Sequence, residues 1–146
     1  VAGSIGTIPS TVDERTAGFV QNAARWINAD VTFNFTAQQA LLAEHARCFG
    51  ISGRDAIIAS SRAGYAGTAW GIPYSITIDP NLAMASFDFD VIDRVADKIT
   101  GRGTDLVHFA SATNGSVIKI DTFRHVYDQP NWVKQQTCDN DTRAMP

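Results

Sequence analysis

Apolar residues near the start of the chain recur with the spacing of an α-helix. A capping pattern at Thr11 and Glu14 opens this predicted helix. One face of it is formed by Val12, Phe19, Val20, Ala23, Trp26 and Ile27. The alternating segment 30–35 predicts a short strand. Two more helices are predicted over residues 36–49 and 52–64, because each begins at a capping residue and ends near a glycine.

The second half of the chain alternates in the way that is typical of antiparallel strands. Strands are predicted over residues 74–78 and 84–95, and a hairpin is predicted over residues 105–128. The hairpin turns at Asn114-Gly115, a pair that accepts the positive φ angles of a tight reversal. Residues two apart in a strand share a face, so Phe123, His125 and Tyr127 are expected on one side of the last strand.

Length and composition fit a single globular domain. A chain of 146 residues with 45% hydrophobic and 18% charged residues can bury a core of ordinary size. We expect an irregular arm over residues 1–10, one domain over 11–132 and a polar tail over 133–146. The net charge of -3 argues against a nucleic-acid partner. No apolar run approaches the roughly 20 residues of a membrane span.

Cysteines and glycosylation triplets bear on the compartment. Cys48 and Cys138 form either one disulfide or two separate thiols, and the sequence leaves both open. Asn-x-Ser/Thr triplets begin at Asn34, Asn114 and Asn140, which is more than chance would give. These triplets favour a secretory origin, with the cytoplasm as the alternative.

We expect neither a metal nor a cofactor. His45 and Cys48 share a face of the predicted helix, but a structural zinc site needs four ligands, and His108, His125 and Cys138 show no ligand spacing. The glycine-rich segment 64–71 lacks the Lys-Ser/Thr ending of a phosphate loop. Trp70 and Tyr74 beside it either line the mouth of a cavity or cover an edge of the core.

The order of elements resembles the nuclear-transport-factor-like superfamily, and within it the SnoaL-like polyketide cyclases. The resemblance rests on Gly53-Arg-Asp-Ala-Ile57 opening a helix and on the final strand pair ending at Asp128. It implies an α+β fold in which a cone-shaped, curved antiparallel sheet packs around N-terminal helices and encloses an apolar pocket. It also implies a homodimer.

The resemblance places an acid/base position of the last strand on His125. An imidazole titrates near neutrality and can move a proton on a bound substrate. Asp93 is the first candidate to orient it and Asp30 the second, while His108 on the neighbouring strand can assist. The predicted pocket residues are Phe33, Phe35, Trp70, Tyr74, Phe123 and Tyr127.

Two functions of different classes follow. The leading hypothesis is a cofactor-free isomerase, cyclase or dehydratase that acts on a small apolar, carbonyl-bearing or polycyclic substrate by proton transfer. The alternative is a secreted protein that binds a small molecule in its pocket without reacting. A strand histidine between aromatic residues is also common as a hydrogen-bonded core residue, so His125 alone does not separate these two hypotheses.

Overall fold

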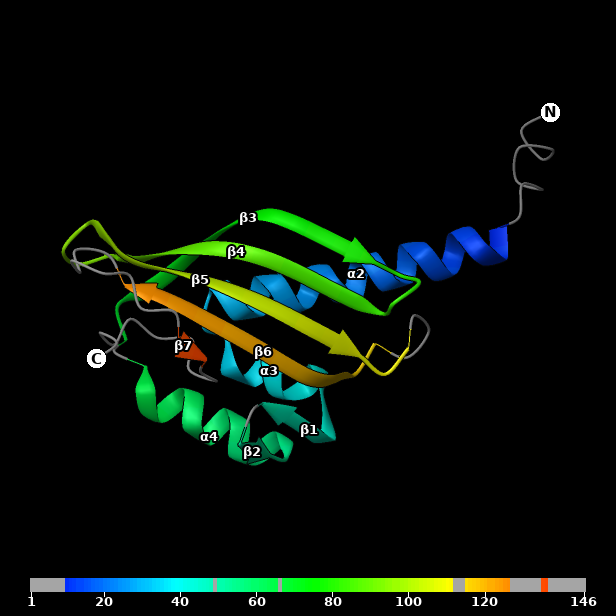
Figure 1. Ribbon diagram of the computed structural model, residues 1–146, viewed down its shortest axis with the longest axis horizontal. Coiled ribbons are helices and arrows are strands. Elements are labelled where there is room, and N and C mark those ends of the chain that lie inside the picture. Colours follow the sequence, from blue (N-terminus) through cyan, green and yellow to red (C-terminus); the bar gives the residue numbers. More distant parts are fainter. Residues whose placement is uncertain (1–9, 49, 66, 112–114, 127–134, 137–146) are drawn as a thin grey trace.

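The computed structural model describes residues 10–48, 50–65, 67–111, 115–126 and 135–136, with the backbone alone at 10–15, 64, 121–126 and 135–136. The elements in chain order are α2 (Ser10–Val31), α3 (Phe35–Leu41), β1 (Leu42–Cys48), β2 (Ile51–Ser52), α4 (Arg54–Gly64), β3 (Ala69–Asp79), β4 (Met84–Asp93), β5 (Lys98–Phe109), β6 (Val117–Val126) and β7 (Gln135–Gln136). Figure 1 shows the helices gathered along one side of a curved sheet, with α2 passing behind the long strands.

The sheet runs in the order β2-β1-β6-β5-β4-β3, and β7 pairs with β6. The strands from β3 to β6 form an antiparallel meander. β1 joins β6 in parallel, so the sheet is mixed rather than purely antiparallel. The sheet does not close on itself, because β3 and β2 end the strand order at opposite edges. The predicted α+β class, a curved sheet around helices, is confirmed.

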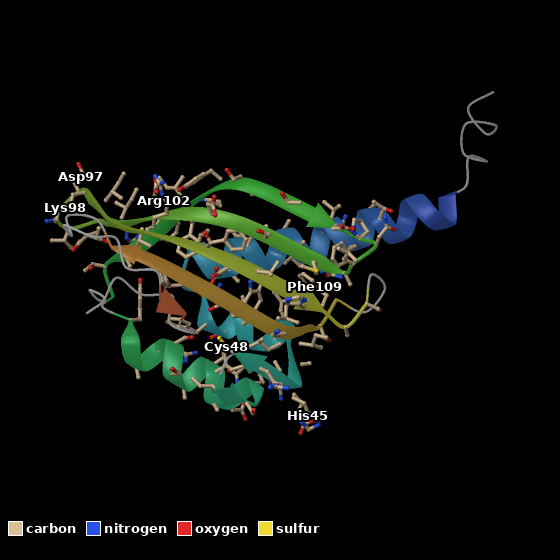
Figure 2. All side chains as sticks on the ribbon, viewed as in Figure 1. His45, Cys48, Asp97, Lys98, Arg102 and Phe109 are labelled. Carbon is tan, nitrogen blue, oxygen red and sulfur yellow. The ribbon has the colours of Figure 1, made fainter. Side chains whose placement is uncertain are left out.

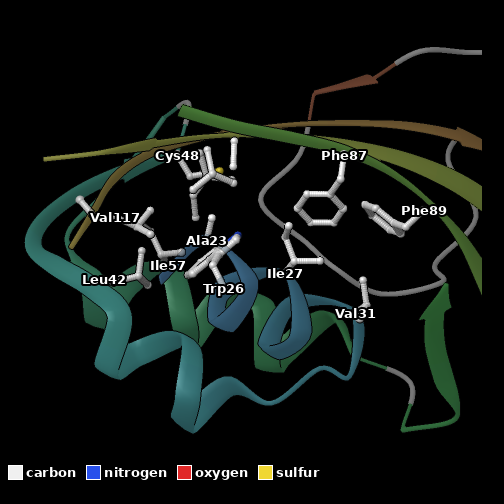
Figure 3. Packing of buried hydrophobic residues seen from close by; sticks show 14 of the residues in the cluster. Ala23, Trp26, Ile27, Val31, Leu42, Cys48, Ile57, Phe87, Phe89 and Val117 are labelled. Carbon is white, nitrogen blue, oxygen red and sulfur yellow. The ribbon is translucent and has the colours of Figure 1, made fainter. Parts of the chain in front are cut away.

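The core lies between the helices and the inner face of the sheet. Along β4 and β5 every second residue is buried, as the alternation of a half-buried sheet requires. From α2, Phe19 and Trp26 enter this core with at most 1% of their surface exposed. Figure 3 shows Trp26 between α2 and the strands that carry Phe87 and Phe89. Burying each of these large side chains contributes about 1.5–3 kcal/mol.

Two glycines allow closer packing than any other residue would. Gly103 of β5 lies opposite Phe89 of β4. A Cβ at Gly103 would lie 2.3 Å from the Phe89 ring, so the ring covers the bare backbone. A Cβ at Gly71 of β3 would lie 2.9 Å from the Cβ of Val31. The end of α2 therefore rests directly on the backbone of β3.

Two early predictions were wrong. Residues 30–35 are not a strand, because α2 continues to Val31 and a turn follows in which Phe33 has a φ of 54°. The side chain of Asn34 then caps α3 by accepting a hydrogen bond from the Ala37 backbone N–H. Residues 42–48 are strand β1 rather than helix, because their backbone pairs with β6 and β2. Tertiary pairing overrides the local helical spacing there.

Other boundaries moved less. α4 begins at Arg54 after a glycine cap, with no side-chain cap from Ser52. β3 is longer than predicted, and β4 ends before Val95. The antiparallel pairing of the last hairpin is confirmed, although its turn residue Asn114 lies outside the described residues. So do most of the predicted N-terminal arm and of the C-terminal tail. In the part of the chain that the structure describes, no helix has the length and hydropathy to span a membrane.

We predict that Gly103→Ala destabilises the fold. The added methyl overlaps the Phe89 ring, and overpacking of this kind costs about 1–3 kcal/mol. Gly18→Ala is the control, because Gly18 lies within α2 and has nothing within 4 Å of the added Cβ. Alanine at a helix interior is favoured over glycine by roughly 0.5–1 kcal/mol. The midpoint of urea unfolding should therefore fall for Gly103→Ala and rise for Gly18→Ala. Equal midpoints would contradict the close contact between Gly103 and the Phe89 ring.

Candidate functional site

A buried polar cluster lies where α2 and α3 meet. Asp30 and Gln38 are each 2% exposed. The side-chain amide of Gln38 donates to Asp30 Oδ1 at 3.0 Å. Trp26 lies one turn before Asp30 on the same face of α2 and is 1% exposed. Residues from two helices are thus joined inside the core by a polar contact.

Two polar atoms of this cluster have no hydrogen-bond partner among the described residues. They are the indole N–H of Trp26, a donor, and the side-chain oxygen of Gln38, an acceptor. Figure 3 shows the indole nitrogen on the side of Trp26 that faces the sheet. A buried polar group without a partner costs about 1–3 kcal/mol, so such groups are uncommon and call for an explanation.

A second carboxylate lies on the inner face of the sheet. Asp105 of β5 is fully buried and lies opposite Phe87 on one side and Thr122 on the other. Carboxylates are seldom buried, because moving a charge out of water is costly. The interior between the helices and the sheet therefore carries acidic groups at Asp30 and Asp105.

An apolar groove of about 430 Å³ runs between α2 and the edge strand β3. Its lining is formed by Ala24, Ile27, Asn28, Val31, Thr32, Trp70, Gly71, Ile72, Pro73, Ile76 and Ile78. None of these lining residues is ionisable. The size lies within the range of small-molecule sites, and the lining suits an uncharged ligand.

The edge of β3 resists the addition of another strand. Pro73 supplies no backbone N–H there, and Ser75 has a φ of 51° where the register with β4 shifts. The groove therefore suits a small molecule better than an extended peptide. At one end, the guanidinium of Arg94 lies 4.9 Å from the centre of the Trp70 ring.

The predicted pocket residues separate into different places. Trp70 lines the groove. Phe33 and Phe35 instead pack around Tyr65, with ring centres 4.7 and 5.5 Å away. Tyr74 lies beside Asp90 and Arg102: its hydroxyl is 3.4 Å from Asp90 Oδ1, and Arg102 Nε is 3.3 Å from the same oxygen. The side chain of Phe123 and the whole of Tyr127 lie outside the described residues.

The predicted proton-transfer residues are not gathered at one point. Asp93 ends β4, and its Oδ1 accepts the backbone N–H groups of Val95 and Ala96 in the turn that follows. His108 lies opposite Met84, at the other end of the β4–β5 pair. Nine residues of strand separate the two ends, which is about 30 Å. Figure 2 shows these ends, marked by Lys98 and Phe109.

His125 is placed by its backbone only. The register sets it opposite Arg102, and its side chain lies outside the described residues. Its role as acid or base stays a prediction. Among the predicted acid/base residues whose side chains the structure describes, Asp30 is buried in the core, while Asp93 and His108 are only partly buried. Sequence reasoning missed Gln38 and Asp105, although Asp105 has the same strand parity as Val107 and Phe109, which marked it as inward-facing.

The remaining candidates lie at the surface or outside the described residues. His45 is exposed and Cys48 is fully buried, because residues three apart in a strand lie on opposite faces. His45 and Cys48 therefore do not share a face, as they would have in the predicted helix, and Figure 2 shows the two residues well apart. Cys48 is disulfide-bonded. Cys138, the other cysteine of the sequence, lies outside the described residues.

Comparison with known proteins supports the fold. No protein-family model matches the chain, and no curated protein matches it. A protein of unknown function with a cystatin-like fold from Methylobium petroleophilum PM1 superposes with a TM-score of 0.58 at 16% identity, covering 82% of this chain and 85% of that one. A putative isomerase of the SnoaL-like family from Agrobacterium tumefaciens C58 gives a TM-score of 0.51 at 14% identity, covering 76% and 97%. At these identities the likeness establishes that the chain shares the fold of these two structures, and it does not establish the activity.

We predict that Gln38→Leu destabilises the protein by about 1–3 kcal/mol, because it removes a buried donor from the Asp30 carboxyl group. Gln39→Leu is the matched control. Gln39 also donates to a carboxylate, that of Asp55, but this bond is exposed. A surface change of this kind stays within roughly 0.5 kcal/mol. Chemical denaturation measures the free energy of unfolding of both variants. Equal losses of stability would show that the buried Gln38–Asp30 bond contributes no more than the exposed Gln39–Asp55 bond.

Proposed function

We propose that the protein is a cofactor-free, isomerase-type enzyme that moves a proton on a small apolar, carbonyl-bearing substrate. The observation that carries the proposal is the buried cluster of Asp30, Gln38 and Trp26. It combines a carboxyl group with a donor and an acceptor that have no partner among the described residues. Such a set, enclosed by apolar side chains, is typical of sites in which a carboxyl group exchanges protons with a ligand.

In this proposal Asp30 takes a proton from the carbon next to the substrate carbonyl. The same carboxyl group then returns a proton to another carbon, so the reaction consumes no cofactor. Gln38 holds the carboxyl group in place through its amide, and its free oxygen together with the Trp26 N–H can meet polar groups of the substrate. Cyclisation and dehydration use the same proton transfers and belong to the same proposal.

The groove gives the substrate a place next to this cluster. Ile27 and Val31 line the groove, and they flank Asp30 on the same helix. With 3.6 residues per turn, Asp30 is rotated about 60° from Ile27 around the axis of α2. It is rotated about 100° from Val31, so the proposal requires apolar side chains between the groove and the carboxyl group to move when the substrate binds. The proposal includes the homodimer that the resemblance implies.

The test is proton exchange on a panel of cyclic enones and fused-ring ketones in D2O, followed by NMR and mass spectrometry. We expect the wild-type protein to label at least one ketone at the carbon next to its carbonyl. Asp30→Asn should lower that rate by about 100- to 10,000-fold, because a positioned base contributes that much. Asp97→Asn, at an exposed residue of the β4–β5 turn, is the control and should leave the rate unchanged. A wild-type protein that labels no ketone, or an equally active Asp30→Asn variant, contradicts the enzyme proposal.

The second candidate is a secreted protein that binds a neutral apolar molecule without chemistry. The observation that favours it is the groove itself, since none of the described residues that line it is ionisable. A ligand there would be held by apolar contacts along Ile72, Ile76 and Trp70, whose side chains are exposed.

For this binding role we predict that Ile72→Ser weakens the affinity for a neutral solvatochromic dye by about tenfold, since each well-buried apolar side chain contributes roughly 1.5 kcal/mol. Ile118→Ser is the matched control. The two isoleucines are similarly exposed, at 49% and 41%, but Ile118 lies on β6 and does not line the groove. Fluorescence titration measures both. If both variants bind as the wild type does, the groove is not the binding site.

A further inference from the structure

We propose that Asn34 carries an N-linked glycan. The triplet Asn34-Phe35-Thr36 has the acceptor pattern, and the structure places it in the turn between α2 and α3. Asn34 and Thr36 are exposed, while Phe35 between them is 7% exposed. The middle residue of an acceptor triplet can be almost any type, and here it is Phe35, whose buried ring anchors the turn. Asn34 and Thr36, the two residues that the pattern requires, face solvent.

The hydrogen bond of Asn34 directs its amide nitrogen away from the protein. Oδ1 accepts from the Ala37 backbone N–H at 3.1 Å. A backbone N–H can only donate, so the oxygen faces the helix and Nδ2 branches to the other side. Nδ2 makes no hydrogen bond to any described residue. The nitrogen that would receive the sugar is therefore accessible.

The helix cap and the glycan are compatible. N-glycosylation replaces one hydrogen on Nδ2 and leaves Oδ1 unchanged, so α3 keeps its cap in the modified protein. The hydroxyl of Thr36 is 3.5 Å from Arg62 Nη2, a long and exposed contact that holds the Thr36 side chain only weakly. Because sugars are added to the chain before it has folded, the folded protein has only to leave room for them.

An independent observation agrees with the compartment that this modification needs. Cys48 is disulfide-bonded and fully buried. Disulfides form and persist in oxidising compartments such as the secretory pathway, where N-glycans are added. The inference does not depend on the proposed proton-transfer chemistry, because neither Asn34 nor Thr36 belongs to the buried cluster.

The co-reactant is a lipid-linked oligosaccharide pyrophosphate. Nδ2 attacks the anomeric carbon of the first sugar, and the bond from that carbon to the pyrophosphate oxygen breaks. The amide loses one proton to solvent, the lipid pyrophosphate leaves as the anion, and nothing is oxidised or reduced.

The test is production of the full chain behind a secretion leader in a eukaryotic cell, with the protein recovered from both membranes and medium. Peptide N-glycosidase in 18O-water converts an occupied asparagine to aspartate and marks it in the peptide mass spectrum. We expect the mark at Asn34 in the wild type. An unmodified Asn34 in all recovered wild-type chains overturns the proposal.

Three variants separate the glycan from the helix cap. Asn34→Asp keeps a capping oxygen but removes the acceptor nitrogen, so it should lose the Asn34 glycan. Thr36→Ala should lose it as well while Asn34 stays in place, and it settles the question if Asn34→Asp fails to fold. Thr36→Ser is the matched control and should retain the glycan, because a hydroxyl remains at the third position. If Thr36→Ala and Thr36→Ser are equally modified, the modification is not the one proposed.

Discussion

The close contact between α2 and the inner face of the sheet is the constraint on which the rest of the structure depends. Gly71 lets the helix end rest on the backbone of β3, and Trp26 of the same helix is buried in the core. A larger residue at Gly71 would force the helix outward. The spacing set by this contact determines both the depth of the core and the width of the groove beside β3.

The same helix carries the groove and the buried cluster on neighbouring sectors of its surface. Val31 and Ile27 face the groove and the core, while Asp30 turns toward Gln38. A carboxyl group in such a place is unfavourable for stability unless it is hydrogen-bonded. The amide of Gln38 offsets part of that cost. Asp30 and Asp105 are the acidic groups among the buried polar residues that the structure describes, which also include Gln38 and Ser61.

The fold alone would not separate an enzyme from a binding protein, because folds of this kind host both. The two solved structures described above are 16% and 14% identical to the chain in sequence, and one of them is a protein of unknown function. Particular side chains, rather than the fold, therefore distinguish an enzyme from a binding protein. The enzyme hypothesis depends on the buried cluster, and the binding hypothesis depends on the groove between α2 and β3.

The sequence by itself determined the long strands, the last hairpin and most of the first helix, because their apolar periodicity is sustained over many residues. It also determined the α+β class, through the order of these elements and the family resemblance. It did not determine the segment 30–48, where short apolar runs fit either helix or strand. Only the tertiary structure decided that residues 42–48 pair with β6, that Asn34 caps a helix and that Gln38 reaches Asp30. The pairing of β1 with β6 joins residues far apart in the chain, and the Asn34 cap and the Gln38–Asp30 bond depend on where α2 ends and α3 begins. None of these contacts leaves a period in the sequence.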